Sequence, residues 1–294
     1  MSILYIIGNG FDLYHGLPTS YKDFYEFGKD LLDEIEEFYK LDISSATPWS
    51  DFEKALGEFD WKSFYDFHNH IDVDDEGFRP SFVSGLHDDI AEQTDHHVKA
   101  IRGCFQQWID DIEVLSATKT LSFAENARFI SFNYTSTLQD VYCVDDINLL
   151  HIHGCVKKYD ELIFGHGETM KEESEFDKDG EPTRTMFTEA EDAAKYPFYA
   201  LKKPVDDVLD EHKEFFDSLK DLQEIIILGH SINKIDWPYF EKISRNAPNA
   251  RWTYCLRDDE RMDEEIQYIY RLNQCGVLRD KIRFTRYAYL TLQA

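Results

Sequence analysis

Ile3-Leu4-Tyr5-Ile6-Ile7-Gly8-Asn9-Gly10 is the stretch of sequence that decides the fold. Five apolar, β-prone residues in a row are typical of a strand that is buried on both faces, as strands in parallel sheets are. The two glycines then end this strand sharply. The stretch therefore predicts the first strand and the first turn of an α/β fold.

Later segments repeat this form, in which a buried strand is followed by a small or polar turn. Five further strands are predicted, at residues 128–132, 147–150, 224–228, 251–256 and 281–287. Amphipathic helical patterns lie between the later strands, at residues 206–221, 236–245 and 259–273. Strands that alternate with helices predict an α/β fold with a Rossmann-like, mainly parallel sheet.

One long region interrupts this alternation. Its apolar residues have helical spacing, so we interpret residues 20–123 as a large helical insertion after the first strand. The chain is then a single α/β domain, 1–294, with a core formed by residues 1–19 and 124–294. A second, charged insertion at about residues 168–195 is predicted to be either a surface loop or a lid.

The charge of the chain limits its partners. Asp and Glu number 58 against 31 Lys and Arg, which gives a formal net charge of −27. Binding to nucleic acid depends on Lys and Arg that displace counterions, so neither nucleic acid nor an anionic membrane is expected as a partner. The five cysteines are scattered and form no Cys-x-x-Cys pair. Scattered cysteines of this kind are expected to be reduced thiols. The sequence has no signal-peptide pattern and no run of about 18 apolar residues, so a cytoplasmic location is expected.

The first candidate site is the turn Gly8-Asn9-Gly10-Phe11-Asp12. Its glycines allow the backbone to approach a ligand beside a helix N-terminus. Leu13 stands where the dinucleotide fingerprint has a third glycine, so an ordinary strand-to-helix turn is the alternative. Because its carboxylate repels phosphate, Asp12 is expected either to bond a ribose hydroxyl or to cap the helix.

Two further candidates follow the second and third predicted strands. Asn133 has a side-chain amide that can orient a water or a sugar hydroxyl, and an Asx turn is its alternative role. His151 and His153 would share one face of a strand with Cys155. One histidine is a candidate general base. A metal site needs further ligands that the spacing does not supply, so no metal is predicted.

The fourth candidate is Gly229-His230-Ser231, followed by Asp236. Ser231 can donate to a phosphate or a ribose, or it can cap the next helix. The segment does not match the Gly-x-Ser-x-Gly elbow of serine hydrolases. In a parallel sheet the carboxyl ends of all strands lie on one edge, so the four candidates are expected to converge there on one site.

These motifs resemble those of the AbiH family of bacterial abortive-infection proteins, which act in antiviral defence. The resemblance extends over most of the chain and is carried by residues 7–12, 16–24, 132–135, 151–154 and 229–231, with Asp236. The pattern is more distantly similar to sirtuin-like domains, which bind NAD. Thr135 and Asp12 differ from that pattern, which has an aspartate and a small hydroxyl residue, respectively, at these positions.

The sirtuin-like resemblance implies a chemistry for the site. Asn133 and His153 match the pair that such domains use on NAD, which implies a hydrolase that cleaves the nicotinamide–ribose bond. The nucleotide-binding residues that it implies are Gly8, Asn9, Gly10, Asp12, Thr135, Gly229, Ser231 and Asp236. The expected partner is a small-molecule nucleotide, with NAD as substrate or ligand. A second copy of the chain or a defence-system protein is expected as a further partner. The alternatives are a nucleotide sensor without turnover and a protein-interaction module in phage defence.

Overall fold

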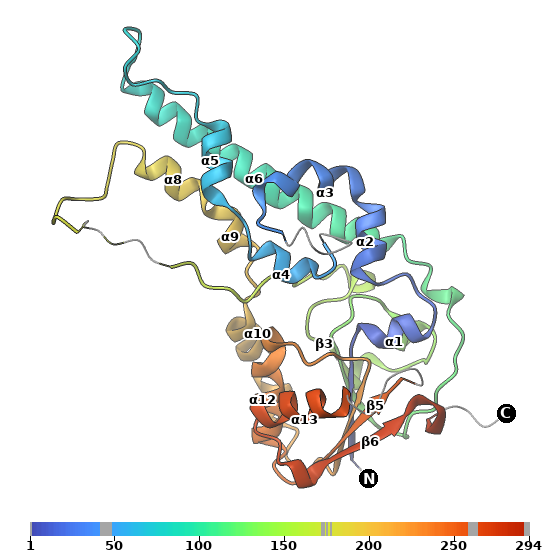
Figure 1. The fold of residues 1–294 in the computed structure, drawn as a ribbon. Coiled ribbons are helices and arrows are strands. Elements are labelled where there is room, and N and C mark those ends of the chain that lie inside the picture. Colours follow the sequence, from blue (N-terminus) through green and yellow to red (C-terminus); the bar gives the residue numbers. More distant parts are fainter. Residues whose placement is uncertain are drawn as a thin grey trace. The chain divides into compact units, whose positions relative to one another are not determined.

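The computed structural model describes residues 2–41, 49–171, 174, 176, 178–257 and 264–290, and the chain divides into two compact units. Unit 1 consists of Met1–Ser20, Ile109–Ile163 and Pro204–Ala294. Unit 2 consists of Tyr21–Trp108 and Phe164–Lys203. The chain therefore leaves unit 1 twice, once after the first strand and once after residue 163 (Figure 1).

Unit 1 is built on a parallel sheet. Its described strands are β1 (Ile3–Ile7), β2 (Arg128–Ser131), β3 (Leu149–His151), β4 (Glu224–Leu228), β5 (Arg251–Leu256) and β6 (Ile282–Arg286). All neighbours pair in parallel, in the order β3-β2-β1-β4-β5-β6. This is the strand order of the Rossmann fold, so the predicted fold class is confirmed.

The central strand β1 is buried on both faces, as its sequence predicts. Leu4 and Ile6 belong to one hydrophobic cluster, and Ile3, Tyr5 and Ile7 belong to another. The first cluster packs under helices α10 (Val205–Glu211), α11 (Lys213–Asp217), α12 (Trp237–Asn246) and α13 (Glu264–Gln274). The second includes side chains from the short helices α1 (Asn9–Tyr14) and α7 (Thr137–Asp140).

Most element boundaries lie within a few residues of those predicted. The third strand begins only at Leu149, because Asp146–Asn148 forms a 3-10 turn, and it ends at His151. The helix predicted at residues 206–221 is divided into α10 and α11. The helix predicted at 259–273 is α13, and the first part of that prediction, up to residue 263, lies outside the described residues.

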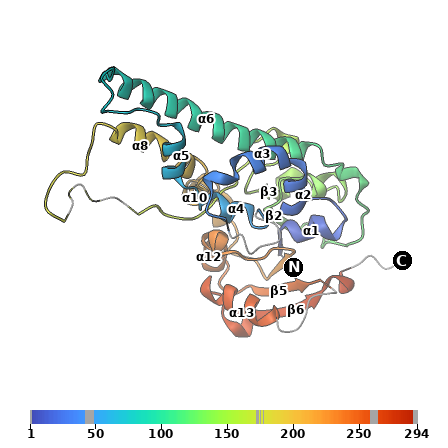
Figure 2. The ribbon, with the colours of Figure 1, turned by 45° about the horizontal axis from the view of Figure 1, so that its top comes forward.

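Unit 2 is helical and aromatic-rich. Its helices are α2 (Tyr21–Phe27), α3 (Lys29–Ile35), α4 (Phe52–Leu56), α5 (Trp61–His68), α6 (Ser81–Asp110), α8 (Thr188–Ala194) and α9 (Tyr196–Ala200). The long helix α6 extends along the whole unit (Figure 2). The buried rings of Phe24, Phe52 and Phe105 pack with centroids 4.7–5.8 Å apart. Two of these ring pairs are T-shaped and one is stacked, and such pairs can hold short helices together because each ring buries a large apolar area.

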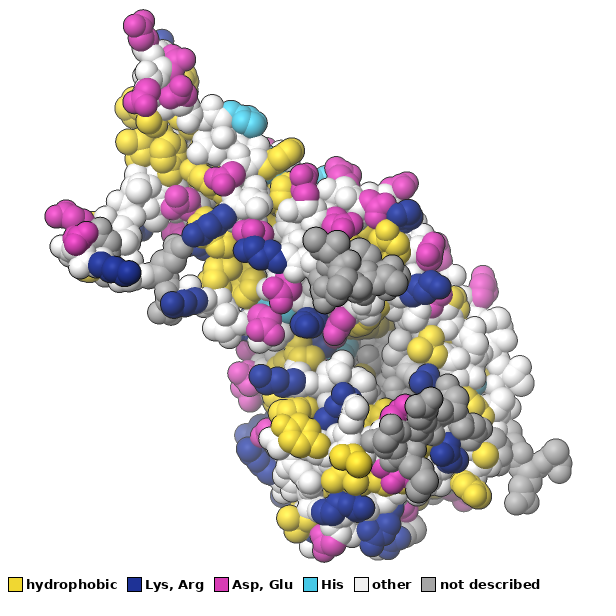
Figure 3. Space-filling view, in the orientation of Figure 1, with side chains coloured by type: hydrophobic (Ala, Val, Ile, Leu, Met, Phe, Trp, Pro, Cys, Tyr) yellow, Lys and Arg dark blue, Asp and Glu magenta, His cyan; other side chains and the backbone are white. Residues whose placement is uncertain are grey.

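Acidic side chains are spread over the drawn face, with Lys and Arg between them (Figure 3). Carboxylates gather at the connection between α5 and α6, where Asp72, Asp74, Asp75 and Glu76 are all exposed. Among the helices that the structure describes, none has an apolar stretch that is long enough to cross a bilayer.

The turns that follow β1 and β4 contact each other through their backbones. The N–H of Gly8 donates to the carbonyl of Leu228 at 2.9 Å, and the N–H of Gly10 donates to that of Gly229 at 2.8 Å. A Cβ atom on Gly229 would lie 2.2 Å from the backbone nitrogen of Phe11. The glycines are therefore required because two stretches of main chain lie against each other.

Replacing Gly229 with alanine is expected to lower the free energy of unfolding by more than about 2 kcal/mol, because backbone atoms cannot move away from the new methyl group. Gly16→Ala is the matched control. Both glycines have a positive φ, +66° for Gly229 and +76° for Gly16, but nothing lies within 4 Å of a Cβ on Gly16. The control should cost only about 1–2 kcal/mol, from the backbone conformation. Urea unfolding measures both, and equal losses would contradict the packing explanation.

Candidate functional site

The predicted site residues of unit 1 lie at the carboxyl edge of the sheet, in the turns that follow β1, β2, β3 and β4. The strand order reverses between β1 and β4, which is where ligands bind in folds of this class. Three sets of contacts organise the edge. They are the glycine contact described above, a pair formed by Asp12 and Thr135, and a cluster formed by His153, Asp236 and His230.

Asp12 is a buried carboxylate within α1. Its side chain is 1% exposed, and Thr135 Oγ1 donates a hydrogen bond of 2.6 Å to its Oδ2. Thr135 in turn lies 3.1 Å from the hydroxyl of Thr137. The residue that caps α1 is Gly8, so Asp12 does not cap this helix. Asp12 instead links the turn after β1 to the turn after β2.

Burial raises the pKa of Asp12 from its ordinary value to about 6, although hydrogen bonds from Thr135, Thr137 and Asn133 act in the opposite direction. Its second oxygen, Oδ1, is buried and accepts no hydrogen bond from the described residues. Nearly all buried polar atoms in folded proteins have a partner. An acceptor without one is therefore a place where a ligand's donor can bind.

Asn133 follows β2 and is only 6% exposed. Its backbone N–H donates to Ser131 Oγ at 3.2 Å, and its carbonyl accepts from His151 Nδ1 at 3.1 Å. The side-chain Oδ1 is buried and makes no hydrogen bond among the described residues, so it does not close an Asx turn. Asn133 therefore presents a second buried acceptor oxygen at this edge.

His151 has a structural role rather than that of a base. Burial lowers the pKa of His151 to about 4, so its ring is neutral at physiological pH. Its Nε2 lies 2.9 Å from Gln139 Nε2, which is a donor, so the ring proton is on Nδ1, which faces Asn133. Both ring nitrogens are thus engaged. Of the two histidines in the motif, His153 is the one left as a candidate base.

His153 lies in the turn after β3 and is 2% exposed. Its ring contacts the rings of Phe132 and Tyr239, with centroids 5.2 and 5.7 Å away. The next residue must be glycine, because Gly154 has φ +81° and a Cβ there would lie 2.6 Å from the carbonyl oxygen of Glu161. The turn therefore fixes the ring of His153 at the sheet edge.

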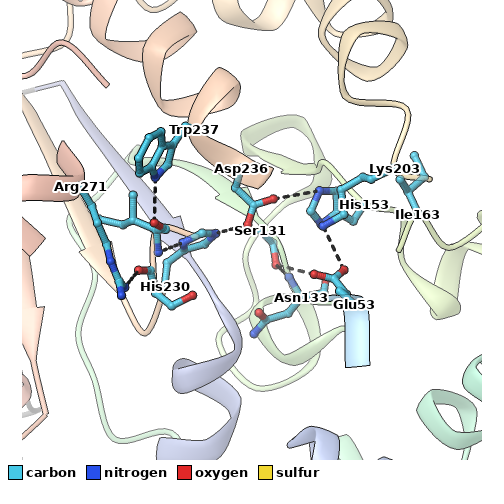
Figure 4. A network of polar contacts seen from close by, with 12 residues as sticks. Glu53, Ser131, Asn133, His153, Ile163, Lys203, His230, Asp236, Trp237 and Arg271 are labelled. Atoms are coloured by element: carbon cyan, nitrogen blue, oxygen red, sulfur yellow. Dashed lines mark hydrogen bonds and ion pairs between the residues drawn. The ribbon is translucent and has the colours of Figure 1, made fainter. Parts of the chain in front are cut away.

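Asp236 lies between two imidazole rings (Figure 4). Its Oδ1 is 4.0 Å from His153 Nε2, and its Oδ2 is 3.6 Å from His230 Nε2. Asp236 is also the N-cap residue of α12, but its carboxylate makes no capping hydrogen bond. Ser231 therefore does not cap this helix either. Its side chain is exposed, and its carbonyl accepts from the Arg271 guanidinium.

Two of the predicted nucleotide-binding residues lie apart from these contacts. The Asn9 side chain is turned to its own loop, where its amide donates to the Thr19 carbonyl at 2.6 Å, and Ser231 is directed to solvent. His230 and Thr137, by contrast, belong to the site although no role was predicted for them. His230 stood in a recognised motif, but its spacing from Asp236 gave no sign that the two side chains would meet.

The described residues contain no group of three or more His, Cys, Asp or Glu side chains arranged to hold a metal ion. The tautomer of His230 in the cluster around Asp236 does not suit a metal ligand. His230 Nδ1 accepts the N–H of Ile232 at 2.9 Å, so a neutral ring carries its proton on Nε2, the nitrogen that faces Asp236. A protonated nitrogen cannot be a metal ligand.

Unit 2 holds a separate groove with a volume of about 570 Å³. It lies between the start of α6 and the segment that leads into α8. Its lining residues are Phe78, Pro80, Val83, Ser84, His87, Arg184, Thr185, Met186, Thr188, Glu189 and Ala190. None of them is among the residues of the sheet-edge site.

Comparison with known proteins gives one family. The family model described as bacteriophage abortive infection AbiH matches residues 4–256, from the second residue of β1 to the last residue of β5. The search of curated proteins found no match to the chain. The matched range includes every predicted site residue.

Replacing Asp12 with asparagine should change the pH dependence of stability. The pKa of Asp12 is raised to about 6 in the folded chain, so its contribution to stability is fully present below about pH 4 and is lost as the pH rises through 6. The free energy of unfolding of Asp12→Asn, relative to the unmodified chain, should therefore rise by roughly 3 kcal/mol between pH 4 and pH 7. Urea unfolding across this range is the measurement. Asp207→Asn, at an exposed carboxylate, controls for the lost charge, and a difference for Asp12→Asn that does not vary with pH would refute the assignment.

Proposed function

Because the chain belongs to the AbiH family, whose role is bacteriophage abortive infection, we propose that it acts by binding NAD at the carboxyl edge of the sheet and hydrolysing the nicotinamide–ribose bond. The reaction takes NAD and water to nicotinamide, ADP-ribose and a proton. The proposal places the reaction in the cytoplasm, on a small-molecule nucleotide. The net charge of −27 is in accord with this choice over a nucleic acid or a membrane.

The observation that carries the proposal is the pair of buried acceptor oxygens, Asp12 Oδ1 and Asn133 Oδ1, at the edge where the strand order reverses. Acceptors without partners match a ligand that brings hydrogen-bond donors. Ribose hydroxyls are such donors, and phosphate oxygens are not. The acceptor oxygens of the site therefore fit the hydroxyls of a nucleotide's sugar.

The glycine turns have a different role from that of a phosphate-binding loop. The space beside Gly8 and Gly10 is filled by the backbone of Gly229 and His230, at 2.6–2.9 Å from a Cβ in either position. Ligand contact at this edge then depends on the side chains of the strand ends. The carboxylate of Asp12, which repels phosphate, directs the sugar rather than the diphosphate towards itself.

The two departures from the sirtuin-like pattern support the same site. Asp12 stands where that pattern has a small hydroxyl residue, and Thr135 stands where it has an aspartate. In this chain the two side chains are hydrogen-bonded to each other at 2.6 Å. A carboxylate and a hydroxyl are therefore both kept at this point of the site, with their positions in the sequence exchanged.

The chemistry needs an oriented sugar, a placed water and a proton acceptor. Nicotinamide leaves as a neutral group, and the ribose passes through a transition state that resembles an oxocarbenium ion. Asn133 holds the water or a sugar hydroxyl, and His153 accepts the proton as water attacks. The Asp236 carboxylate, 4.0 Å from the ring, stabilises the positive charge that His153 then carries.

Purified protein incubated with NAD should release free nicotinamide, measured by chromatography. Asn133→Ala and His153→Ala should each lower the rate by about 10²-fold or more, the range of a placed base or an oriented reactant. The controls are Asn273→Ala and His96→Ala, at exposed positions, which should keep the rate of the unmodified chain.

Other outcomes separate the rival functions. Binding of NAD without release of nicotinamide indicates a nucleotide sensor. Neither binding nor release, in protein taken from phage-infected cells as well as from resting cells, would overturn the NAD proposal and favour an interaction module. Equal loss of rate in the control variants would show that the site was wrongly placed.

A further inference from the structure

The cluster around Asp236 contains His230, which the proposed reaction does not use, and Asp236, which it uses only to stabilise the charge on His153. We propose that Asp236 and His230 are positioning residues, which together hold the ring of His153 in the orientation needed to accept a proton. This inference rests on the proposed function of His153. Its basis is the set of hydrogen bonds that fix His230 and the short distances from Asp236 to the two imidazole rings.

Hydrogen bonds fix both the ring and the backbone carbonyl of His230. Its Nδ1 accepts the backbone N–H of Ile232 at 2.9 Å, and its carbonyl accepts the hydroxyl of Tyr254 at 2.9 Å. The proton of the neutral ring is then on Nε2, which faces Asp236 Oδ2 at 3.6 Å. His230 therefore presents a donor to Asp236 in a defined tautomer.

The turn that produces this arrangement is strained. Ile232 has φ +54°, a conformation that is rare for a β-branched residue, and its side chain is fully buried in the core. Trp237 Nε1 donates to the Ile232 carbonyl at 3.1 Å and holds the turn from the other side. Strain of this kind persists only where surrounding contacts enforce it, and it is concentrated at functional sites.

Asp236 connects the fixed ring to His153. A buried aspartate at the start of a helix normally caps the free N–H groups, but this carboxylate makes no capping bond. Its two oxygens face the two imidazoles, and all three side chains are less than a tenth exposed. A carboxylate that orients a histidine, with a further group that orients the carboxylate, is the arrangement that activates bases in many hydrolases.

The first test does not depend on activity. The full chain is labelled with ¹⁵N-histidine, and the ring signals of His153 and His230 are assigned from the spectra of His153→Gln and His230→Gln. Asp236→Asn should shift the ring nitrogens of both histidines, and His230→Gln should shift those of His153. Asp207→Asn, at an exposed position, should shift neither.

An unchanged His153 signal in Asp236→Asn would overturn the proposal. Should Asp236→Asn fail to fold, as judged by circular dichroism, Asp236→Glu and His230→Gln provide the same comparison. Asp236→Glu keeps the carboxylate and changes its reach, and His230→Gln replaces the imidazole with an amide that can still donate.

The second test is kinetic and uses NAD. Asp236→Asn should lower kcat by at least about 10-fold, a part of the 10²–10⁴ that a placed base contributes, and should change KM by less than about 3-fold. His230→Gln, whose amide N–H can replace the Nε2 donor, should keep more activity than His230→Ala. Equal activity in these two variants would contradict a positioning role. Absence of turnover in the unmodified chain would refute the proposed function alone, because the ¹⁵N comparison still decides whether Asp236 and His230 orient His153.

Discussion

The contact on which the site depends is the one between two stretches of main chain, where the turn after β1 lies against the turn after β4. Hydrogen bonds from Gly8 and Gly10 join the turns, and no side chain fits between them. A Cβ on Gly8 would lie 2.6 Å from the Cα of His230. The contact therefore brings the part of the edge that carries Asp12 and the part that carries His230 and Asp236 into one fixed arrangement.

Two carboxylates are buried at this edge, and neither serves stability in the usual way. Asp12 is held by threonine hydroxyls and has a pKa of about 6, so its ionised form at neutral pH costs folding free energy. Asp236 occupies the N-cap position of α12, but its carboxylate makes no capping hydrogen bond. Groups that a fold would replace with apolar side chains, if stability were the only demand, are the groups that a ligand site needs.

The regular parts of the fold could be predicted from the sequence, because they depend on local periodicity. Leu4 and Tyr5 are buried on opposite faces of β1, and β4 and β5 contain runs of buried residues. Each of these patterns lies within a single strand. The packing of residues 164–203 with residues 21–108 depends on side chains that are far apart in the sequence. Lys203 pairs with Glu53 at 3.0 Å, for example, and no local pattern shows it. Likewise, Ile232, whose N–H donates to His230 Nδ1, has a positive φ that contradicts the preference of isoleucine.

The polar side chains of the edge fall into two groups. The unpartnered acceptor oxygens of Asp12 and Asn133 lie in the segments that follow the adjacent strands β1 and β2. The imidazoles of His153 and His230 and the Asp236 carboxylate lie in the turns after β3 and β4, the strands on either side of that pair. His151 is neutral and bridges the carbonyl of Asn133 and the amide of Gln139, so it does not compete for a proton at this edge. Under the proposed function, a sugar that donates to the acceptors after β1 and β2 would therefore lie next to side chains that can take up a proton, as hydrolysis requires.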